Sequence, residues 1–225
     1  MVMMRKLNYW LIYWAATSVA VIVSYFWLDR PIARLVAGHL HRQHGGFFSF
    51  LTHFPDPLIP TALIVIIVLG LRTLAGTSSA DNPLLRLKSA IVVCSISVIL
   101  TETIKDELKF IFGRTWPETW IRSNPSFIRD GVYGFNFLHG GVGYQSFPSG
   151  HMALACAVFT ILWIWYPKLR FAYLIITALI AVLLIAGNYH FLSDVIAGAF
   201  VGISTALLTI VIWNAYFPTR AAHFK

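Results

Sequence analysis

The chain has 225 residues, of which 58% are hydrophobic and only 12% are charged. Soluble domains carry about a quarter charged residues, so this composition excludes an ordinary soluble enzyme, a disordered chain and a collagen-like rod. The formal net charge is +8, but no basic run accompanies a soluble fold, and we expect no nucleic-acid partner. Cys94 and Cys156 each lie within an apolar run, which argues against a disulfide framework. The sequence is that of an integral membrane protein.

Six apolar segments are long enough to cross a bilayer. A spanning helix needs roughly 20 apolar residues, and fewer where flanking Lys or Arg side chains reach the headgroups. We therefore predict an all-α protein, a six-helix transmembrane bundle that forms a single domain over residues 1–225. The predicted spans are Asn8–Leu28, Leu58–Ala75, Leu84–Ile104, Met152–Tyr166, Phe171–Gly187 and Val195–Phe217. The first is longer than a signal-peptide core and lacks a small-residue cleavage site, so we expect a retained anchor.

The basic residues give the orientation only indirectly. With the amino terminus inside, the 17 Lys and Arg residues divide nine inside to eight outside. Five of the outer ones lie in or just before the long loop Gly113–Gly150, where the positive-inside rule is weak. We predict a plasma (inner) membrane protein with a cytoplasmic amino terminus and this loop on the extracytoplasmic, periplasmic side.

A further helix is expected between the first two spans. Ile32, Leu35, Val36 and Leu40 recur at helical spacing, which is typical of a helix that lies in the membrane interface. The histidines near it lack a Cys or carboxylate to complete a ligand set, so no metal or other cofactor is predicted.

Gly198 and Gly202 form a small-xxx-small pair in the last span. Such a pair lets a neighbouring helix approach closely or marks a dimer face. Packing within the bundle is the favoured interpretation.

The first candidate functional element ends the long loop, which holds seven of the 15 glycines and leads into Ser146-Phe-Pro-Ser-Gly-His151. Pro148 cannot continue a helix backwards, Ser149 is a good N-cap, and Gly150 permits close approach of a ligand. A helix amino end with free N–H groups attracts anions, and His151 would lie on its first turn. The alternative is an ordinary capped helix start.

The second element is the pair His190 and Asp194, between the fifth and sixth spans. Positions i and i+4 share a helix face, so Asp194 can accept a hydrogen bond from one ring nitrogen and leave the other free to attack an electrophile. Alternatively, Asp194 only caps the last helix. The predicted topology places His190 and His151 at the same membrane face, which favours the functional interpretation.

The third element is a pair of cations at the end of the third span. Lys105 and Lys109 are one helical turn apart, and Arg114 follows shortly after. The lysines either reach for lipid headgroups or clamp a phosphate. The clamp is favoured because these cations share a face with both histidines.

Taken together, these elements resemble the type 2 phosphatidic acid phosphatase superfamily, membrane lipid-phosphate phosphatases whose fold is shared with vanadium haloperoxidases. The family signature is Lys-x6-Arg-Pro, then Pro-Ser-Gly-His, then Ser-Arg-x5-His-x3-Asp. The second motif is intact at Pro148–His151, and His190 and Asp194 retain the end of the third. Lys109 and Pro117 retain two positions of the first.

Two positions depart from that signature within the region of resemblance, roughly Leu84 to Phe217. Trp116 stands where the first motif has arginine, and Leu183-Leu184 stand where the third has Ser-Arg. In the family both arginines hold phosphate oxygens. We predict that Arg114, two residues before Trp116, takes over this role.

The resemblance implies a metal-independent phosphatase without a cofactor. His190 would attack phosphorus and form a phosphohistidine, Asp194 would orient the ring, and His151 would protonate the leaving alkoxide. The predicted phosphate-binding residues are Lys105, Lys109, Arg114, Ser149 and Gly150. The substrate would be a phosphomonoester or diphosphate of a lipid that stays within the bilayer.

Three other functions are alternatives to a lipid phosphatase. The nearest is a phosphotransferase on the same scaffold that passes phosphate or a phospho-headgroup to a lipid acceptor. A transporter is disfavoured because the spans carry almost no ionisable residues away from their ends. A non-catalytic lipid-binding relative is supported only by the two missing arginines.

Overall fold

The computed structural model describes residues 2–39, 57–74, 85–119 and 123–216. The longer helices are α1 (Val2–Val23), α2 (Asp29–His39), α4 (Leu58–Leu74), α5 (Leu85–Phe112), α7 (Gly150–Trp165), α8 (Arg170–Ala186) and α9 (Leu192–Tyr216). Short helical turns occur at α6 (Phe127–Asp130), Val142–Tyr144 and Pro167–Leu169. Within these described ranges there is no β-strand, only isolated bridges. The prediction of an all-α protein is confirmed.

Four of these helical segments are long and apolar enough to cross a membrane. They are Trp10–His39, Leu87–Phe112, Pro167–Ala186 and Leu192–Tyr216. The other two predicted spans correspond to shorter apolar helices, Leu58–Leu69 and Gly150–Trp165. Three predicted span ends, Ala75, Leu84 and Phe217, lie outside the described residues. The chain is a multi-pass membrane protein.

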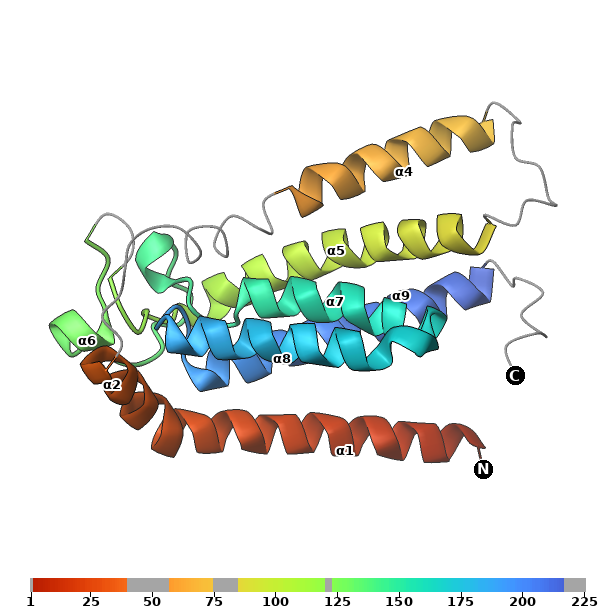
Figure 1. Cartoon of the computed structure of the whole chain (residues 1–225). Coiled ribbons are helices and arrows are strands. Elements are labelled where there is room, and N and C mark those ends of the chain that lie inside the picture. Colours follow the sequence, from red (N-terminus) through yellow and green to blue (C-terminus); the bar gives the residue numbers. More distant parts are fainter. Residues whose placement is uncertain (1, 40–56, 75–84, 120–122, 217–225) are drawn as a thin grey trace.

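The long helices lie side by side and alternate in direction along one common axis (Figure 1). Helix α7 packs mainly against α9, and α5 borders α4, α7 and α9. The end of α5, the start of α7 and the turn between α8 and α9 all come to the end of the bundle that holds α2 and α6. The start of α1 and the end of α9 lie at the opposite end (Figure 1). Segments far apart in sequence therefore meet at one end.

Helix α2 continues directly from α1. A π-helical turn, Ser24–Leu28, joins them, and beyond it α2 turns across the end of the bundle (Figure 1). Ala33 and Val36 on α2 are buried while Leu35 is exposed. The sequence thus predicted a helix here correctly, and the structure shows that it follows the first span without an intervening loop. Leu40, the last residue of the predicted stripe, lies outside the described residues.

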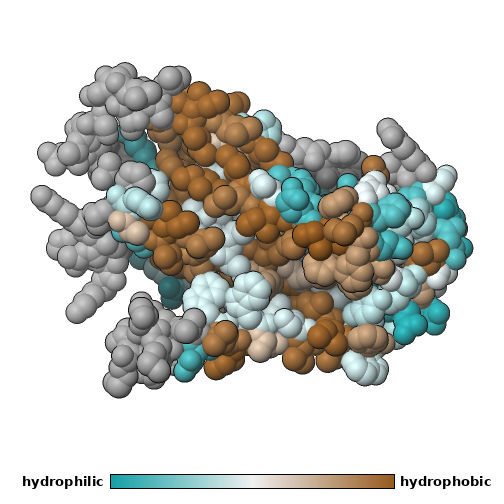
Figure 2. Space-filling model, turned by 180° about the vertical axis from the view of Figure 1, so that it is seen from behind, coloured by the Kyte–Doolittle hydropathy of each residue, from teal (hydrophilic) through white to brown (hydrophobic). Residues whose placement is uncertain are grey.

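The outer surface matches a lipid environment. Large apolar side chains are exposed along α1, α4 and α8, and Phe171 retains 82% of its accessible surface. In Figure 2, hydrophobic atoms cover most of the helices' length, and hydrophilic atoms gather at the end that holds α2 and α6. Exposed apolar area on this scale indicates a membrane-facing surface.

Two glycines allow the close approach of α7 and α9. A Cβ atom added at Gly198 would lie 2.4 Å from the Ser149 carbonyl oxygen, and one at Gly202 would lie 2.0 Å from that of Ala153. Both distances are far below van der Waals contact with backbone atoms that cannot move alone. This confirms that the small-xxx-small pair serves packing within the bundle.

We expect Gly202→Ala to destabilise the bundle. Its methyl group would overlap the Ala153 carbonyl, and overpacking of this kind typically costs about 1–3 kcal/mol. The measurement is thermal unfolding of the detergent-purified protein. Gly38→Ala on α2 is the matched control, since nothing lies within 4 Å of its added Cβ and alanine favours helix over glycine. Equal midpoints for the two variants would contradict the packing argument.

Candidate active site

Helix α5 carries the two lysines on its last turns, because it continues through Phe112 and not only to Ile104 as predicted. Lys105 is buried, and its Nζ lies 2.7 Å from Glu102 Oε1 and 2.6 Å from Asp106 Oδ1. Its charge is already paired within the helix.

Lys109 differs from Lys105 in its electrostatic surroundings. It makes no ion pair with any carboxylate in the part of the chain that the structure describes. Its Nζ lies 3.7 Å from the point that a Cβ on Gly150 would occupy. Lys109 therefore brings a cation without a close ion-pair partner among the described residues to the amino end of α7.

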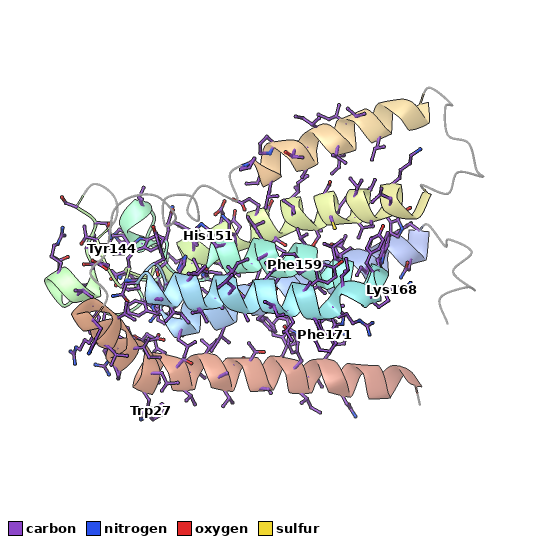
Figure 3. All side chains as sticks on the ribbon, viewed as in Figure 1. Trp27, Tyr144, His151, Phe159, Lys168 and Phe171 are labelled. Carbon is purple, nitrogen blue, oxygen red and sulfur yellow. The ribbon has the colours of Figure 1, made fainter. Side chains whose placement is uncertain are left out.

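The start of α7 forms as the sequence predicts. Ser149 is the N-cap and its side chain accepts a hydrogen bond from the Met152 N–H. Its own N–H donates to the Asp194 carbonyl oxygen at 3.0 Å, which ties this helix start to α9. His151 follows on the first turn, and Figure 3 places it at the same end of the bundle as Tyr144 and far from Lys168.

His190 lies in the turn between α8 and α9, with only 3% of its surface exposed. Its ring centre is 6.2 Å from that of His151 and 5.3 Å from that of Trp116. The structure therefore brings together the two histidines that lie 39 positions apart in the sequence. Burial lowers the pKa of His190, while the neighbouring Asp194 acts in the opposite direction. The imidazole is held neutral, as a nucleophile requires.

Asp194 has more partners than the sequence indicates. Its Oδ2 accepts hydrogen bonds from Ser146 Oγ at 2.7 Å and from the Phe191 N–H at 3.0 Å. The second contact is the backward-reaching bond of a capping box, because Phe191 precedes α9 and Asp194 is its third residue. The expected hydrogen bond to His190 is not formed: Nδ1 and Oδ2 are 3.7 Å apart. Asp194 thus caps α9, and it also lies beside His190.

Arg114 lies at the centre of a buried ion cluster. Its Nη1 donates to Asp194 Oδ1 at 2.5 Å and to Ser193 Oγ at 2.6 Å. Its Nη2 donates to Asp29 Oδ2 at 2.8 Å and to Tyr133 Oη at 3.1 Å. Both carboxylates and the guanidinium are fully buried. We refer to Asp29, Arg114, Ser193 and Asp194 as the buried ion cluster.

These surroundings do not support the prediction that Arg114 replaces the missing phosphate-binding arginine. Its terminal N–H groups are already engaged, and its Nε is buried without a partner. Aromatic rings surround the guanidinium, namely those of Tyr25, Tyr133, Phe135 and Phe191. Nearness in sequence to Trp116 did not reveal that the side chain turns inward.

The two departing positions offer no donor to a phosphate. The Trp116 indole N–H donates to the Val142 carbonyl oxygen at 2.8 Å, so the ring, not the N–H, faces His190. Leu184 is apolar and buried. Lys109 remains as a cation beside the amino end of α7, and its charge acts on His190.

Sequence reasoning missed Asp29, Ser146 and Tyr133. Asp29 belongs to the buried ion cluster, and Ser146 and Tyr133 contact it, yet the sequence assigned a role to none of the three. The sequence position of Asp29 could have identified it as a candidate, because it is an acidic residue at the end of an apolar span. An ionisable group in such a position usually has a partner or a function.

The arrangement is suited to transferring a phosphate-sized anion. A helix amino end, the Lys109 ammonium and two facing histidines converge at one place. Across the described ranges, no group of three or more His, Cys, Asp or Glu side chains is placed to hold a metal ion.

Comparison with known proteins gives concordant matches. The family model of the PAP2 superfamily matches residues 88–218. The lipid A 1-phosphatase of Rhizobium johnstonii is 26% identical over 201 residues, covering 88% of this chain and 78% of that protein. The lipid A 1-phosphatase of Rhizobium etli is 30% identical over 117 residues, covering 52% and 47%. The crystal structure of Aquifex aeolicus LpxE matches with a TM-score of 0.51 and 21% identity over 84% of this chain and 98% of that chain, which shows a shared fold.

We expect Arg114→Met to destabilise the protein strongly. The substitution leaves the buried carboxylates of Asp29 and Asp194 without their shared cation, and removing one partner of a buried ion pair costs about 3–5 kcal/mol. Unfolding in detergent measures the loss. Lys168→Met removes the same charge from an exposed position at the opposite end of the bundle and should leave the stability unchanged. An Arg114→Met variant as stable as Lys168→Met would show that the cluster contributes nothing to the fold.

Proposed function

Because the chain belongs to the PAP2 superfamily, we propose that it removes phosphate from a membrane lipid with His190 as the nucleophile. The family and the lipid A 1-phosphatase relatives identify it as a membrane lipid phosphatase of the PAP2 type, and so as a hydrolase. The observation that carries the finer proposal is the pair His151 and His190, whose ring centres are 6.2 Å apart beside the amino end of α7.

In the first step, the unprotonated ring nitrogen of His190 attacks phosphorus and the bond from phosphorus to the lipid oxygen breaks. His151 gives its proton to the leaving alkoxide, so the lipid departs as an alcohol. In the second step, His151 takes a proton from water, whose oxygen attacks the phosphohistidine and releases inorganic phosphate. Asp194 stabilises the ring of His190 from its other side.

The phosphate is held by Lys109 and by the amino end of α7, with the Gly150 N–H and the Ser149 hydroxyl as donors. Lys109 supports this assignment because it has no close ion-pair partner among the described residues and because it points toward Gly150. Lys105 also lies beside Gly150, but Glu102 and Asp106 bind its ammonium. We therefore assign Lys105 to packing beside Gly150 and Arg114 to the buried ion cluster.

The substrate is a lipid phosphomonoester whose acyl chains remain in the bilayer while its headgroup reaches the end of the bundle. Two relatives are lipid A 1-phosphatases, which supports a phosphorylated glycolipid of the lipid A type. The ring of Trp116 beside His190 supplies an aromatic face against which a sugar packs well.

We further propose six membrane crossings within one domain, with α4 and α7 added to the four longer helices. The amino terminus lies in the cytoplasm and the active site faces the periplasm across the plasma (inner) membrane. In support, the start of α1 and the candidate site lie at opposite ends of the bundle (Figure 1).

The experiment is phosphate release from a panel of lipid phosphates by the detergent-purified protein, with and without EDTA. We expect release from lipid A 1-phosphate that survives chelation and is abolished in His190→Ala, because that variant lacks the nucleophile. His151→Ala should retain a residual rate reduced by about 10²–10⁴-fold, the usual contribution of a general acid. His39→Ala, an exposed histidine on α2, is the control and should be fully active.

Other outcomes would redirect the proposal. Full activity in His190→Ala, or loss of wild-type activity with EDTA, would contradict the histidine mechanism. If phosphate appears only on an added lipid acceptor and not in solution, the protein is the phosphotransferase that the same scaffold also allows.

The pH dependence follows from the burial of His190. Burial lowers its pKa below the ordinary value of about 6.5. The ring therefore stays unprotonated to lower pH than a free histidine, and the acid limb of kcat/KM should lie below pH 6.5. A pH profile measured with lipid A 1-phosphate tests this, with buffer matched for ionic strength. An acid limb centred above 6.5 would mean that His190 is not the group that must be deprotonated.

A further inference from the structure

Asp29 comes from a part of the chain outside the matched family region, which begins at residue 88. It is the first residue of α2, and its side chain is fully buried. Its Oδ1 accepts the Ser193 N–H at 2.9 Å, and its Oδ2 accepts bonds from Arg114 Nη2 at 2.8 Å and from the Ser193 hydroxyl. An acidic group buried this completely needs a reason, because its desolvation is costly.

The charges of the buried ion cluster do not balance. One guanidinium stands between two carboxylates, those of Asp29 and Asp194, so the cluster has a formal charge of −1. If Arg114 were paired with Asp194 alone, the two charges would cancel at the position next to His190. Asp29 competes for the guanidinium and leaves part of the charge of Asp194 uncompensated.

An uncompensated negative charge on Asp194 would stabilise the cationic ring that His190 acquires when it is phosphorylated. When its Nε2 bonds to phosphorus, the ring keeps the proton on Nδ1 and becomes cationic. Asp194 Oδ2 lies 3.7 Å from Nδ1, and in a buried site a charge at that distance acts strongly. A neutral Arg–Asp pair would give little of this stabilisation.

We propose that Asp29 is a positioning residue of the phosphatase site: it shares the guanidinium of Arg114 with Asp194 and holds Ser193, so that part of the charge of Asp194 stays uncompensated beside His190. The proposal rests on the proposed function of His190 as nucleophile. It assigns to the amino-terminal helices a part in the reaction, although they lie outside the family match.

A purely structural role is the competing explanation, since Asp29 also fastens α2 to the start of α9. The two explanations differ in what Asp29→Asn does to a folded enzyme. The amide can still accept the Ser193 N–H, so the anchoring persists while the charge is lost. Arg114 then neutralises Asp194, and the cationic form of His190 becomes less favourable.

The experiment compares wild type, Asp29→Asn and Glu107→Gln in detergent, each checked for folding by size exclusion and thermal unfolding. Glu107→Gln is the control, the same replacement of a carboxylate by an amide at an exposed position of α5. For Asp29→Asn we expect kcat to fall by about tenfold or more with KM within about twofold, because the stabilisation is needed in the transition state and not in substrate binding. If the Asn variant does not fold, Asp29→Ser removes the same charge with a smaller side chain.

The pH profile separates positioning from anchoring. The groups that face His190 are Lys109 on α5, His151 on α7 and Asp194 on α9, with Arg114 behind Asp194. None of these is altered by Asp29→Asn. The acid limb of kcat/KM should therefore move to lower pH, since a less negative cluster makes protonation of His190 harder.

The outcomes are distinguishable from a failure of the proposed function, which would appear as a wild-type protein without phosphatase activity. With an active wild type, a folded Asp29→Asn variant with unchanged kcat overturns the proposal. So does an acid limb that stays in place or moves to higher pH, or a loss confined to KM.

Discussion

Burial of the Arg114 guanidinium carries a large desolvation free energy, which only acceptors inside the protein can offset. This requirement determines the structure at the end of the bundle that holds α2 and α6. Arg114 has no solvent contact, so its donors need acceptors inside the protein. The acceptors come from the start of α2, the loop after α6 and the start of α9. None of these segments adjoins the others in sequence. Because the guanidinium is planar and its donors have fixed directions, pairing it fixes where all three segments lie.

The packing of α7 against α9 determines where the amino end of α7 lies relative to Asp194. The absence of a side chain at Gly198 lets the Ser149 carbonyl approach α9, and the Ser149 N–H then reaches the Asp194 carbonyl oxygen. One close helix contact thus sets the distance between the amino end of α7, where an anion is attracted, and Asp194 beside His190. Small residues serve this purpose in membrane bundles, since helix association there depends on close packing.

The sequence predicted well what depends on periodicity and poorly what depends on side-chain direction. Apolar runs located the helices, and alternation of direction brought His151 and His190 to one end. The inward turn of Arg114 could not be predicted, because its carboxylate partner Asp29 lies 85 positions away. The pairing of Lys105 with Glu102, by contrast, was available from their i,i+3 spacing.

On the proposed function, the two positions that depart from the family signature change how the site holds its substrate. Trp116 places a ring, and not a cation, beside His190, and Leu184 is buried and apolar. The buried ion cluster adds negative charge nearby. On the proposed function, the phosphate clamp consists of Lys109 and a helix amino end, and such a clamp holds free phosphate weakly compared with one that includes bidentate arginines. On the proposed function, affinity then comes mainly from the lipid part of the substrate. The same weakness favours release of inorganic phosphate after hydrolysis, so a sparse clamp suits a hydrolase acting on a substrate already concentrated in the bilayer.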